Sequence, residues 1–501
     1  MISSSCHDIL PPILNDQFQP GICMKRFAYK IIFFLLSAFL TGNSFSGYTL
    51  IDPLGNNRAN LIDNDLNVVH SWDFGSRPAS MPYLFPDRTI LRPGMAEIIY
   101  MNGQSVGGLI QIFDWYSENL WTYVLADNLY QQHHDILPMP DGNVLVLVWE
   151  RIPYEEIISS GRVQFSGEFW PETLIELEPV GETQANIVWM WRLWDHLIQD
   201  VNPQVQDYGV VSEHPELLDI NYGTVGGDGP FSNNGDWIHA NGIDYNQALD
   251  QIAISARHTS EIYIIDHSTT TEEAAGHSGG NCGKGGDFLY RWGNPEVYGQ
   301  GDSTDRRLFY QHDIQWIREG LPGEGKLLVF NNGNERQPEP YSSIEEWFPP
   351  LEPDGNYSLN AEGCYGPDSA DLVFADPENF YCGFQGGVNR QPNGNSLITY
   401  SSNRSLFEVD TEGTVVWEYI DPMNLYTARA HRYSPDYITL DPKGDCNGDG
   451  YLDILDISLI IDIILELSEP SDYQEWTSDA NEDGTIDILD LVVIVFTIIE
   501  N

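Results

Sequence analysis

The sequence predicts an all-β fold, a six-bladed β-propeller, followed by a small α-helical module. Three observations lead to this prediction: a strand-rich unit that recurs along the chain, tryptophans that recur with that unit, and an acidic loop that occurs twice near the C-terminus. The chain has 501 residues, of which 42% are hydrophobic, with 45 Gly and 30 Pro. This length and composition are typical of a turn-rich globular protein with a large core and one appendage.

Residues 1–46 are predicted to be a secretory signal with an over-extended start. Counted from Met24, the basic stretch MKRFAYK precedes a short apolar run at 31–40, and SFS at 44–46 forms a small-x-small cleavage site before Gly47. The apolar run is too short for a transmembrane helix, which needs about 20 residues. We therefore expect a secreted protein, at the cell surface, outside the cell or in the periplasm, with no membrane span in the mature chain.

The recurring unit, expected over residues 47–441, has three parts. A turn of the type P-D/N-G-N opens an apolar strand, a second strand ends on an acidic residue, and a third strand carries Trp. Clear copies occur at 140–195, 248–295 and 392–421, and weaker copies begin near 50, 86 and 323. Short strands at this spacing, separated by Gly and Asn, indicate about six propeller blades. A β-sandwich would explain the strands but not the recurrence of whole units.

Two longer stretches, 151–235 and 335–384, are rich in Trp, Tyr, Glu and Pro. We interpret them as insertions that shape the mouth of a pocket.

Three histidines occupy similar places in different copies of the unit. His134 precedes Gly142 of its turn by eight residues, His312 precedes Gly320 by the same interval, and His239 stands before the turn of its own copy. Because the first strand of every blade lines the central channel, equivalent positions meet at the axis however far apart they are in sequence. The sequence therefore predicts that the three imidazoles share one pocket.

Imidazole and guanidinium groups indicate the chemistry of such a pocket. An imidazole with its ordinary pKa of about 6.5 can attack, donate or accept a proton at neutral pH. Arg257, predicted on the second strand of the blade that carries His239, adds a fixed cation, which suits an oxyanion of sulfur or phosphorus. Neighbours along a strand alternate faces, so structural roles are expected for the remaining strand and loop histidines considered, namely His133, His258, His267, His277 and His431.

The acidic loop of the C-terminal module, residues 442–501, occurs as DCNGDGYLDILD at 445–456 and as DANEDGTIDILD at 479–490. Oxygen ligands at loop positions 1, 3, 5, 7, 9 and 12, with Gly at position 6, form the cage that Ca²⁺ prefers. The sequence thus predicts two calcium sites, in which Tyr451 and Thr485 contribute backbone carbonyls. The predicted side-chain ligands are Asp445, Asn447, Asp449, Asp453 and Asp456 in the first site, and Asp479, Asn481, Asp483, Asp487 and Asp490 in the second.

The strong negative charge excludes two classes of partner. With 75 Asp+Glu and 23 Lys+Arg, the formal charge of −52 repels nucleic acid and anionic lipid, so neither is an expected partner.

Cleavage before Gly47 leaves four cysteines, and export permits disulfides. Cys364 and Cys382 bracket one loop-like segment and are the expected pair. No CxxC motif or His/Cys cluster indicates a zinc site.

A set of motifs together resembles the arylsulfotransferase family over roughly residues 48–440: HHDILPMPDGN (133–143), DWIHANGIDY (236–245), ISARHTSEIYIID (254–266), QHDIQWI (311–317) with KLLVFNNGNER (326–336), and RQPNGNSLITYSSNRSLFEVDTEGTVVWEY (390–419). The resemblance implies a secreted six-bladed propeller that uses no nucleotide sulfate donor.

The reaction implied by this resemblance is a ping-pong transfer. A phenolic sulfate ester would give its sulfuryl group to His312, and an acceptor phenol would then take it, with no cofactor for the chemistry. His134, His239 and Arg257 would bind the sulfuryl oxygens and stabilise or protonate the phenolic oxygen. Asn241 would support substrate binding in the pocket. Such a loose transfer depends on positioning and on positive groups, as phosphoryl transfer does.

The duplicated loop with Asp at position 12 is similar to a dockerin module, which implies docking onto a cohesin-like protein. Ile454-Leu455 and Ile488-Leu489 stand where cellulosomal dockerins often have Ser-Thr, so these apolar pairs either form a different recognition surface or pack inside the module. A calcium-stabilised cap without a partner is the alternative. LVVIVFTII at 491–499 is too short to span a membrane and is expected to be a buried helix face.

Two other functions remain open at this point. The first is a non-catalytic propeller that binds an anionic ligand or a glycan and uses the C-terminal module as its anchor. The second is an aryl sulfate ester hydrolase, in which water replaces the acceptor phenol. A propeller quinone dehydrogenase is disfavoured, because the sequence shows no matching set of cofactor residues.

Overall fold

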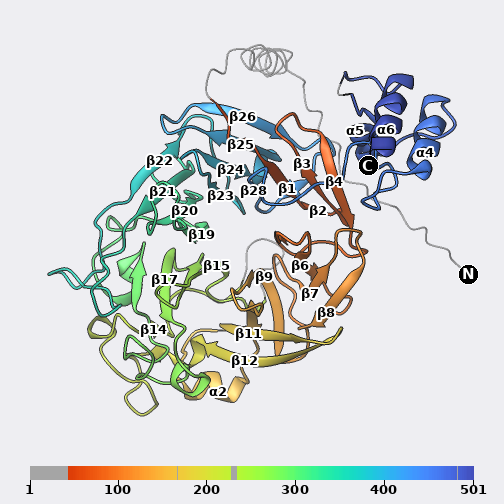
Figure 1. Ribbon diagram of the computed structural model, residues 1–501. Coiled ribbons are helices and arrows are strands. Elements are labelled where there is room, and N and C mark those ends of the chain that lie inside the picture. The colour runs from red at the N-terminus through yellow and green to blue at the C-terminus, as the bar shows by residue number, and fades with distance from the viewer. Residues whose placement is uncertain (1–42, 166, 227–233, 482, 501) are drawn as a thin grey trace, which may run out of the picture. The chain divides into compact units, whose positions relative to one another are not determined.

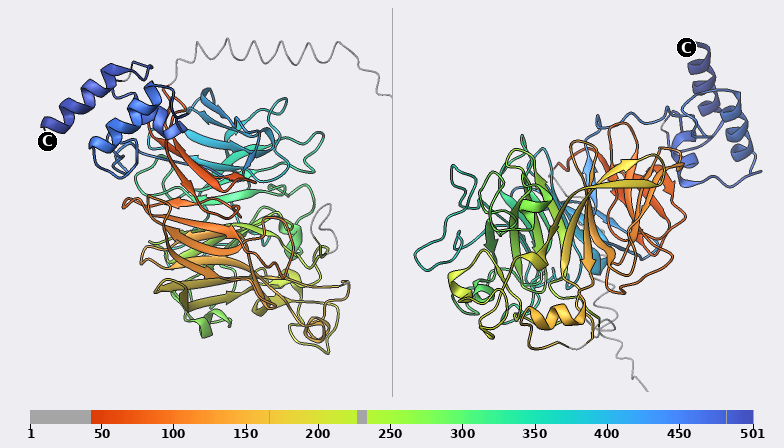
Figure 2. Two further views of the ribbon diagram at one scale, coloured as in Figure 1. Left: turned by 90° about the vertical axis from the view of Figure 1, so that its right-hand side faces the viewer. Right: turned by 90° about the horizontal axis from the view of Figure 1, so that it is seen from below.

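The computed structural model describes residues 43–165, 167–226, 234–481 and 483–500. The signal predicted over 1–46 lies outside these residues except for its last four. In the described part, six four-stranded antiparallel sheets surround a central axis (Figure 1), and Figure 2 shows the same sheets in two perpendicular views. The prediction of an all-β, six-bladed propeller with a helical C-terminal module is confirmed.

Blade 1 combines strands from both ends of the propeller chain, whereas blades 2 to 6 each contain four strands that follow one another in sequence. Blades 1 to 3 consist of β28 (His431–Tyr433), β1 (Tyr48–Ile51), β3 (Arg58–Ile62) and β4 (Val68–Asp73); β5 (Tyr83–Leu84), β6 (Ile90–Met95), β7 (Gly108–Phe113) and β8 (Asn119–Val124); and β9 (Tyr130–Pro138), β10 (Val144–Glu150), β11 (Glu172–Val180) and β12 (Gln184–Arg192). Blades 4 to 6 consist of β15 (Ala240–Asn246), β16 (Gln251–Ala256), β17 (Glu261–Asp266) and β18 (Tyr290–Trp292); β19 (His312–Trp316), β20 (Leu327–Asn331), β21 (Ser343–Trp347) and β22 (Asp371–Ala375); and β23 (Gly387–Arg390), β24 (Ser396–Tyr400), β25 (Ser405–Val409) and β26 (Val415–Ile420).

Short pairs and turns complete the described propeller. β2 (Pro53–Leu54) pairs with β27 (Tyr426–Thr427), and β13 (Leu197–Ile198) pairs with β14 (Leu218–Asp219). The helical turns are α2 (Tyr154–Ser159), η2 (Leu193–Asp195), η3 (Val211–Glu213), α3 (Thr271–Ala274), η5 (Pro295–Tyr298) and η6 (Ser401–Asn403).

The local chemistry of the repeat explains why these strands form. In the turn between β9 and β10, Gly142 has a φ of 93°, a conformation that glycine adopts without steric cost, and the Asp141 carboxylate accepts the N–H of Asn143. All seven residues of β10, VLVLVWE, are buried, because both faces of this strand lie against other parts of the propeller. The P-D-G-N signal and the apolar run after it therefore mark a real hairpin.

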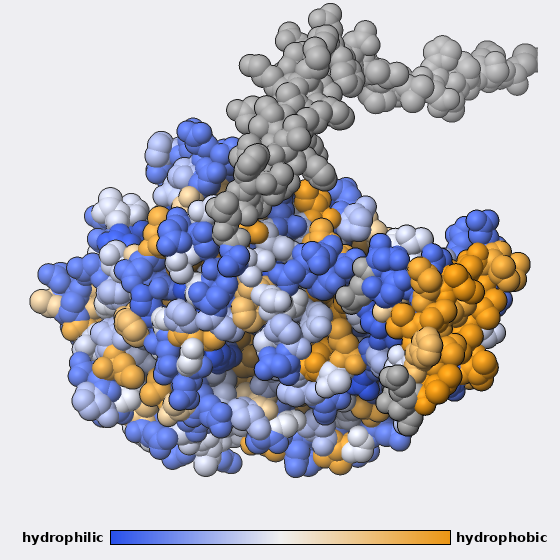
Figure 3. All heavy atoms as spheres, turned by 45° about the horizontal axis from the view of Figure 1, so that its top comes forward, coloured by the Kyte–Doolittle hydropathy of each residue, from blue (hydrophilic) through white to orange (hydrophobic). Residues whose placement is uncertain are grey.

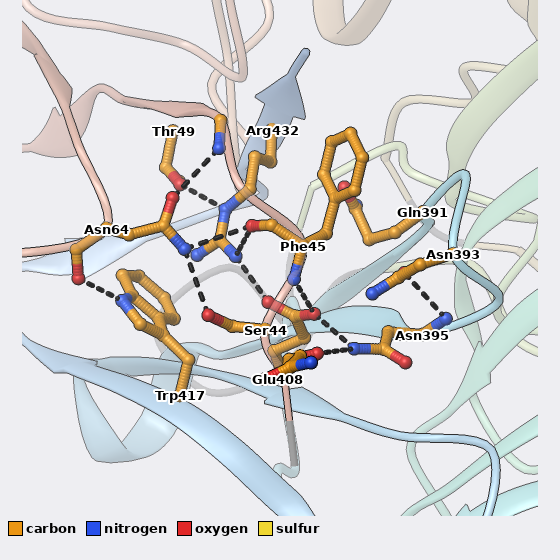
Figure 4. Close-up of polar contacts among 12 residues, drawn as sticks. Ser44, Phe45, Thr49, Asn64, Gln391, Asn393, Asn395, Glu408, Trp417 and Arg432 are labelled. Atoms are coloured by element: carbon orange, nitrogen blue, oxygen red, sulfur yellow. Dashed lines mark hydrogen bonds and ion pairs between the residues drawn. The ribbon is translucent and has the colours of Figure 1, made fainter. Parts of the chain in front are cut away.

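The ring is closed by the pairing of β1 with β28, in which Tyr48 lies opposite Tyr433. Figure 4 shows the polar network beside this closure. Arg432 and Glu408 form an ion pair in which both side chains are fully buried, and the N–H of Phe45 donates to Glu408 over 2.7 Å. Asn64 bonds the Phe45 carbonyl and the Gly47 amide. Cleavage before Gly47 stays a prediction, and it would remove the Phe45 contacts.

Carboxylates on the inner strands connect successive blades. Asp135 accepts the N–H of Ile243, Asp244 that of Trp316, and Asp313 that of Val388, over 3.0, 2.7 and 2.7 Å respectively. Each bond joins a buried carboxylate of one blade to the first strand of the next. The blades are therefore held together by directed polar contacts as well as by apolar packing.

Arg429 joins two of these carboxylates across the ring. Its guanidinium group bonds Asp135 of blade 3 and, over 2.9 Å, Asp313 of blade 5, and all three side chains are buried. Burial raises the pKa of the Asp135 carboxyl, and Arg429 opposes that rise. The arginine thus compensates for the cost of removing both acids from water.

Two expectations are corrected by the structure. The stretches 151–235 and 335–384 are not wholly insertions, because they contain the strands β11, β12, β21 and β22. Their strand periodicity is hidden by the turns and loops beside them. Among the described residues, Cys364 and Cys382 are both free, so the disulfide proposed from their loop-like spacing is wrong.

The C-terminal module has three helices, α4 (Ile454–Ile464), α5 (Asp472–Ser478) and α6 (Ile488–Glu500), and each acidic loop precedes α4 or α6. Asp453 caps α4 by accepting the N–H of Leu455. In the described residues, none of the helices combines the length and apolarity that a bilayer crossing requires.

Replacing Arg429 tests the connection across the ring. Arg429→Leu would leave Asp135 and Asp313 buried without their cation, and we expect a loss of roughly 3–5 kcal/mol in the free energy of unfolding. The matched control is Arg151→Leu, which breaks a partly exposed pair with Glu168 and should cost about 1 kcal/mol or less. Urea unfolding followed by tryptophan fluorescence measures both, and equal losses would contradict the role of Arg429.

Candidate active site

The three histidines singled out from the sequence meet in one pocket of about 460 Å³, together with Arg257. His134 lies on β9, His239 directly precedes β15 and His312 begins β19; Figure 1 shows these three strands on the inside of the ring. The ring centroids of His134 and His239 are 4.6 Å apart, and His312 lines the same pocket. Further polar or aromatic residues of the wall, which the sequence did not reveal, are Arg77, Asn102, Gln104, Ser105, Phe384 and Gln385.

The backbone at this pocket adopts conformations that most residues avoid. His134 and His239 have φ values of 49° and 53°, and Asp313, next to His312, has a φ of 55°. The register of strand pairing shifts at each of these places. Left-handed backbone at a non-glycine residue costs about 1–3 kcal/mol and is concentrated at functional sites. The bulges turn the imidazoles towards the pocket.

The tautomer of His312 follows from its partner Asn332. The side-chain amide of Asn332 donates to the carbonyls of Cys382 and Gln385 over 2.7 and 2.8 Å. Its oxygen therefore faces His312 Nδ1, 2.7 Å away, and must accept a hydrogen from it. In the neutral ring, this arrangement leaves the lone pair on Nε2. Nε2 is thus the basic nitrogen of the His312 ring, and Asn332 is a partner that the sequence analysis missed.

His239 has a carboxylate partner that the sequence analysis also missed. Its Nδ1 lies 2.5 Å from Oδ2 of Asp236, three residues earlier, and Asp236 is fully buried. A carboxylate at this place fixes the hydrogen on Nδ1 and stabilises a positive charge on the ring. The remaining nitrogen, Nε2, is the one suited to proton transfer in the pocket.

His133 and His258, which we had expected to be purely structural, lie directly against the predicted site residues. Nδ1 of His133 is 2.8 Å from Nδ1 of His134, and the His133 ring stacks on Trp149 at 4.0 Å. His258 stacks on His239 at 4.9 Å. Neighbouring residues meet here because the strand is bulged, so alternation between faces does not hold.

Arg257 and Asn241 differ in how they relate to the pocket. The Arg257 guanidinium lies 4.9 Å from the centre of the Tyr310 ring and lines the pocket wall. Asn241 is buried on β15, whereas Arg257 follows β16, and the Asn241 amide donates to the carbonyl of Gln311 over 2.8 Å. Asn241 thus supports the backbone that precedes His312, and its predicted part in substrate binding stays a prediction.

The pocket favours neutral imidazoles. Burial, followed by the charge of Arg257, lowers the pKa of His312 to about 3. Burial also lowers the pKa of His134 and of His239 well below the ordinary value, and neighbouring histidines and Arg257 lower both further. At neutral pH the rings therefore offer lone pairs and neutral N–H groups, and Arg257 supplies the fixed positive charge.

Over residues 94–361, more than half of the chain, the sequence matches the family model described as Arylsulfotransferase (ASST). The chain belongs to the arylsulfotransferase family. Its pocket histidines, His134, His239 and His312, all fall inside the matched range. Among curated proteins, no significant match to this arylsulfotransferase-family chain was found.

Solved structures similar to this family member are propeller-sized chains of low identity. A protein of unknown function from Bacteroides caccae is 14% identical, with 78% of this chain and 99% of that chain covered and a TM-score of 0.40. The periplasmic gluconolactonase PpgL of Pseudomonas aeruginosa is 10% identical, with 78% and 99% covered and a TM-score of 0.38. Neither likeness is strong enough to support an argument about function.

Residues 443–496 match the family model described as Dockerin type I domain, a calcium-binding kind of module, so the resemblance seen in the duplicated loop is confirmed. The residues of the first loop fit an oxygen-ligated cation. Asp445 and Asp456 are fully buried, and burial raises the pKa of Asp445 to about 6. The second loop repeats the arrangement, with Asp490 fully buried and Asp479 accepting the N–H of Gly484.

The apolar pairs of the dockerin are on the surface. Ile454 and Leu455 are 70% and 57% exposed, and Ile488 and Leu489 are 64% and 54% exposed. Figure 3 shows hydrophobic side chains gathered over this helical module. The alternative that these pairs pack inside the module is therefore wrong. Likewise, 491–499 is only partly buried: Leu491 and Ile494 are in the core, whereas Phe496 and Ile499 are exposed.

The lowered pKa of His312 predicts a pH dependence of stability. The folded-state pKa is about 3 and the unfolded value about 6.5, so between these values the unfolded chain binds a proton that the folded chain excludes. The contribution is present above pH 6.5 and is lost as the pH falls. We expect the urea midpoint of the wild type to decrease more steeply from pH 7 to pH 4 than that of His312→Gln. Parallel curves would show that His312 does not contribute.

Proposed function

We propose that this protein is an aryl sulfate sulfotransferase that works by a ping-pong mechanism through a sulfated His312. The observation that carries the proposal is the Asn332 contact, which leaves the lone pair of His312 on Nε2 in a pocket with a fixed cation. Family membership supports sulfuryl transfer in general. The phenolic sulfate donor and the phenolic acceptor are inferred from the family resemblance and from the size of the pocket.

In the first half-reaction, Nε2 of His312 attacks the sulfur of a phenolic sulfate ester. The new N–S bond forms while the S–O bond to the phenol breaks, and the phenolate leaves with the bonding electrons. Arg257 and the single N–H of the neutral His134 ring are our candidates to contact the sulfuryl oxygens and the departing oxygen. With the pKa values of the histidines lowered, stabilising the phenolate by hydrogen bonds is favoured over its full protonation at neutral pH.

In the second half-reaction, an acceptor phenol attacks the sulfur of sulfated His312, the N–S bond breaks, and the ring recovers its lone pair. The phenolic proton must go to a base, and His239 Nε2 is our candidate. Asp236, bonded to Nδ1, stabilises the imidazolium that forms and that then releases its proton to solvent. Every bond that forms or breaks is thus balanced, and the proton of the acceptor phenol passes through His239 to solvent.

We further propose that the protein is secreted and docks through its C-terminal module. The exposed apolar pairs of the two loops support a cohesin-like protein as the partner. The ligand sets predicted at 445–456 and 479–490 would each hold one Ca²⁺, which rigidifies the loops that present those pairs. The loops and the pocket are separate in sequence, so docking and catalysis are proposed to be independent.

The proposal is tested by giving the purified secreted chain, saturated with Ca²⁺, 4-nitrophenyl sulfate with and without an added phenol. Nitrophenolate release that depends on the phenol, with sulfate appearing on that phenol, supports the transferase. Release of inorganic sulfate without an acceptor would instead indicate a hydrolase. Absence of release with several aryl sulfates would indicate a binding protein.

His312→Ala is expected to lower transfer by at least 10⁴-fold, because it removes the nucleophile and not only a contact. A suitable control is His214→Ala, which removes a half-exposed histidine paired with Glu216. Mass spectrometry of the acid-labile adduct, quenched at alkaline pH before acceptor is added, should place the sulfuryl group on His312 in the wild type. Turnover within tenfold of the wild type would refute the assignment.

Calcium removal should loosen the module and leave the chemistry unchanged. With a chelator in excess, we expect faster amide exchange over 445–500, because the buried acids lose their cation, and a transfer rate within twofold of the calcium-loaded protein. Hydrogen exchange read by mass spectrometry and the nitrophenolate assay measure the two effects on one sample. A transfer rate that falls with the exchange protection would contradict the proposed division of roles.

A further inference from the structure

A cluster of two histidines and one aspartate lies outside the proposed active site. His196 follows η2 at the end of blade 3, His277 follows α3, and Asp287 precedes β18. One nitrogen of each histidine and one oxygen of Asp287 all lie within 4.8 Å of one another. Nδ1 of His196 is 2.8 Å and Nδ1 of His277 is 2.7 Å from the same atom, Oδ1 of Asp287. Three potential ligand atoms therefore converge on one point.

His196 is held as a metal-ligating histidine would be. Its ring is fully buried, and its Nε2 lies 2.8 Å from the carbonyl oxygen of Ala274. A carbonyl only accepts, so Nε2 carries a hydrogen. The 2.8 Å contact between Nδ1 and Asp287 needs a hydrogen between the two atoms, and a bound cation would take the place of that hydrogen. Metal-binding histidines characteristically donate their second N–H to a carbonyl or a carboxylate in this way.

The surroundings fix the orientation of this ring. Trp191 lies parallel to His196 with an interplanar angle of 4°, and its indole N–H donates to the carbonyl of Gly286 over 2.7 Å. At Gly286, an added Cβ would lie 2.6 Å from His196 Nε2 and 2.1 Å from the Ala274 carbonyl, so a larger residue does not fit there. The ring and its acceptor are thus part of a closely built site.

We propose that His196, His277 and Asp287 bind one divalent transition-metal ion, for which Zn²⁺ is the best match. Two imidazole nitrogens and one carboxylate oxygen are a ligand set that Zn²⁺ accepts, whereas Ca²⁺ takes oxygen ligands only. The exposed carboxylate of Asp207 interacts electrostatically with His277 and is our candidate for the fourth ligand, with water as the alternative.

The geometry is close to what Zn²⁺ requires. Bonds of about 2.0–2.1 Å in a tetrahedral site place ligand atoms about 3.3 Å apart. The two N···O contacts with Asp287 are roughly half an ångström shorter than this, and the two histidine nitrogens lie within 4.8 Å of each other. His277 can make this adjustment, because its side chain is 59% exposed and belongs to the long connection between β17 and β18.

The metal would fasten this connection, residues 267–289, to blade 3. α3 lies within the connection and packs against β12 of blade 3, while the segment itself belongs to blade 4. Binding of the ion would therefore join blades 3 and 4 by coordination bonds. In the described structure, this place is held by hydrogen bonds and by the packing of α3 on β12. We expect the ion to raise the stability of the fold and to leave catalysis unchanged, because the site is separate from the pocket that contains His312.

The test uses the full chain with Ca²⁺ in excess, so that the acidic loops of the dockerin are occupied. Zn²⁺ binding is measured by competition with a chromophoric chelator, and Co²⁺ is added in place of Zn²⁺ to record visible absorption, which is strong in tetrahedral sites and weak in six-coordinate oxygen sites. We expect one equivalent of Zn²⁺, a cobalt band of tetrahedral type, and a rise in melting temperature with Zn²⁺.

His277→Ala should weaken Zn²⁺ binding at least tenfold and abolish both the cobalt band and the thermal shift. Because His277 is exposed, this variant should fold, and Asp287→Asn, which keeps the shape of the side chain, should behave alike. His214→Ala and His312→Ala are matched controls that should each retain the full equivalent. Absence of Zn²⁺ binding to the wild type, or undiminished binding by His277→Ala, overturns the proposal.

Discussion

The inner ring of buried carboxylates is the constraint on which the rest of this structure depends. Asp135 directly follows His134 and Asp313 directly follows His312, and each carboxylate accepts an amide of the next blade. A shift of one blade would therefore move the neighbouring histidine. Arg429 bonds both acids, so the residues beside the proposed nucleophile and one of its partners are tied to the same guanidinium group. Precise placement in the pocket is a property of the assembled ring and not of any single blade.

The pocket wall carries positive charge, although the chain as a whole is strongly acidic. The formal charge is −52, yet the pocket wall includes Arg257 and Arg77, and its histidines are held neutral by burial. An anion near the axis experiences mainly the local groups, because interactions are strong in a buried site and the distant surface acids are screened by salt. The acidic surface and an anionic substrate are therefore compatible.

The fold was predictable because its signals are local. Each P-D-G-N turn specifies its own hairpin, and repetition of the hairpin specifies the ring, which in turn explains why His134, His239 and His312 were expected to meet. Their partners were harder to predict. Asp236 and His239 carry only a D-x-x-H spacing, which many unrelated segments share. Asn332 follows β20, whereas His312 begins β19, and His133 contacts His134 only because a bulge interrupts the alternation of faces.

The other features that the sequence did not predict correctly also depend on the three-dimensional arrangement of the chain. Cys364 and Cys382 were paired on sequence proximity, but disulfides need closely placed Cβ atoms, and the structure keeps these thiols free. The His196, His277 and Asp287 cluster forms no local motif, because 91 residues separate His196 from Asp287 and only the fold brings them together. The exposed apolar pairs of the dockerin were recognised as unusual, while their orientation required the helices themselves.

The closure of the ring by β1 and β28 has a consequence for how the protein folds. Tyr48 and Tyr433 are paired although 385 residues separate them in sequence, so this contact has a large loop-closure entropy and belongs to the slow, late part of folding. Until residues 431–433 are available, blade 1 lacks one strand, and β1 presents an open edge that invites pairing with other chains. A chain shortened just after the propeller would keep its closing strand, whereas one shortened a dozen residues earlier would lose it and be prone to aggregation.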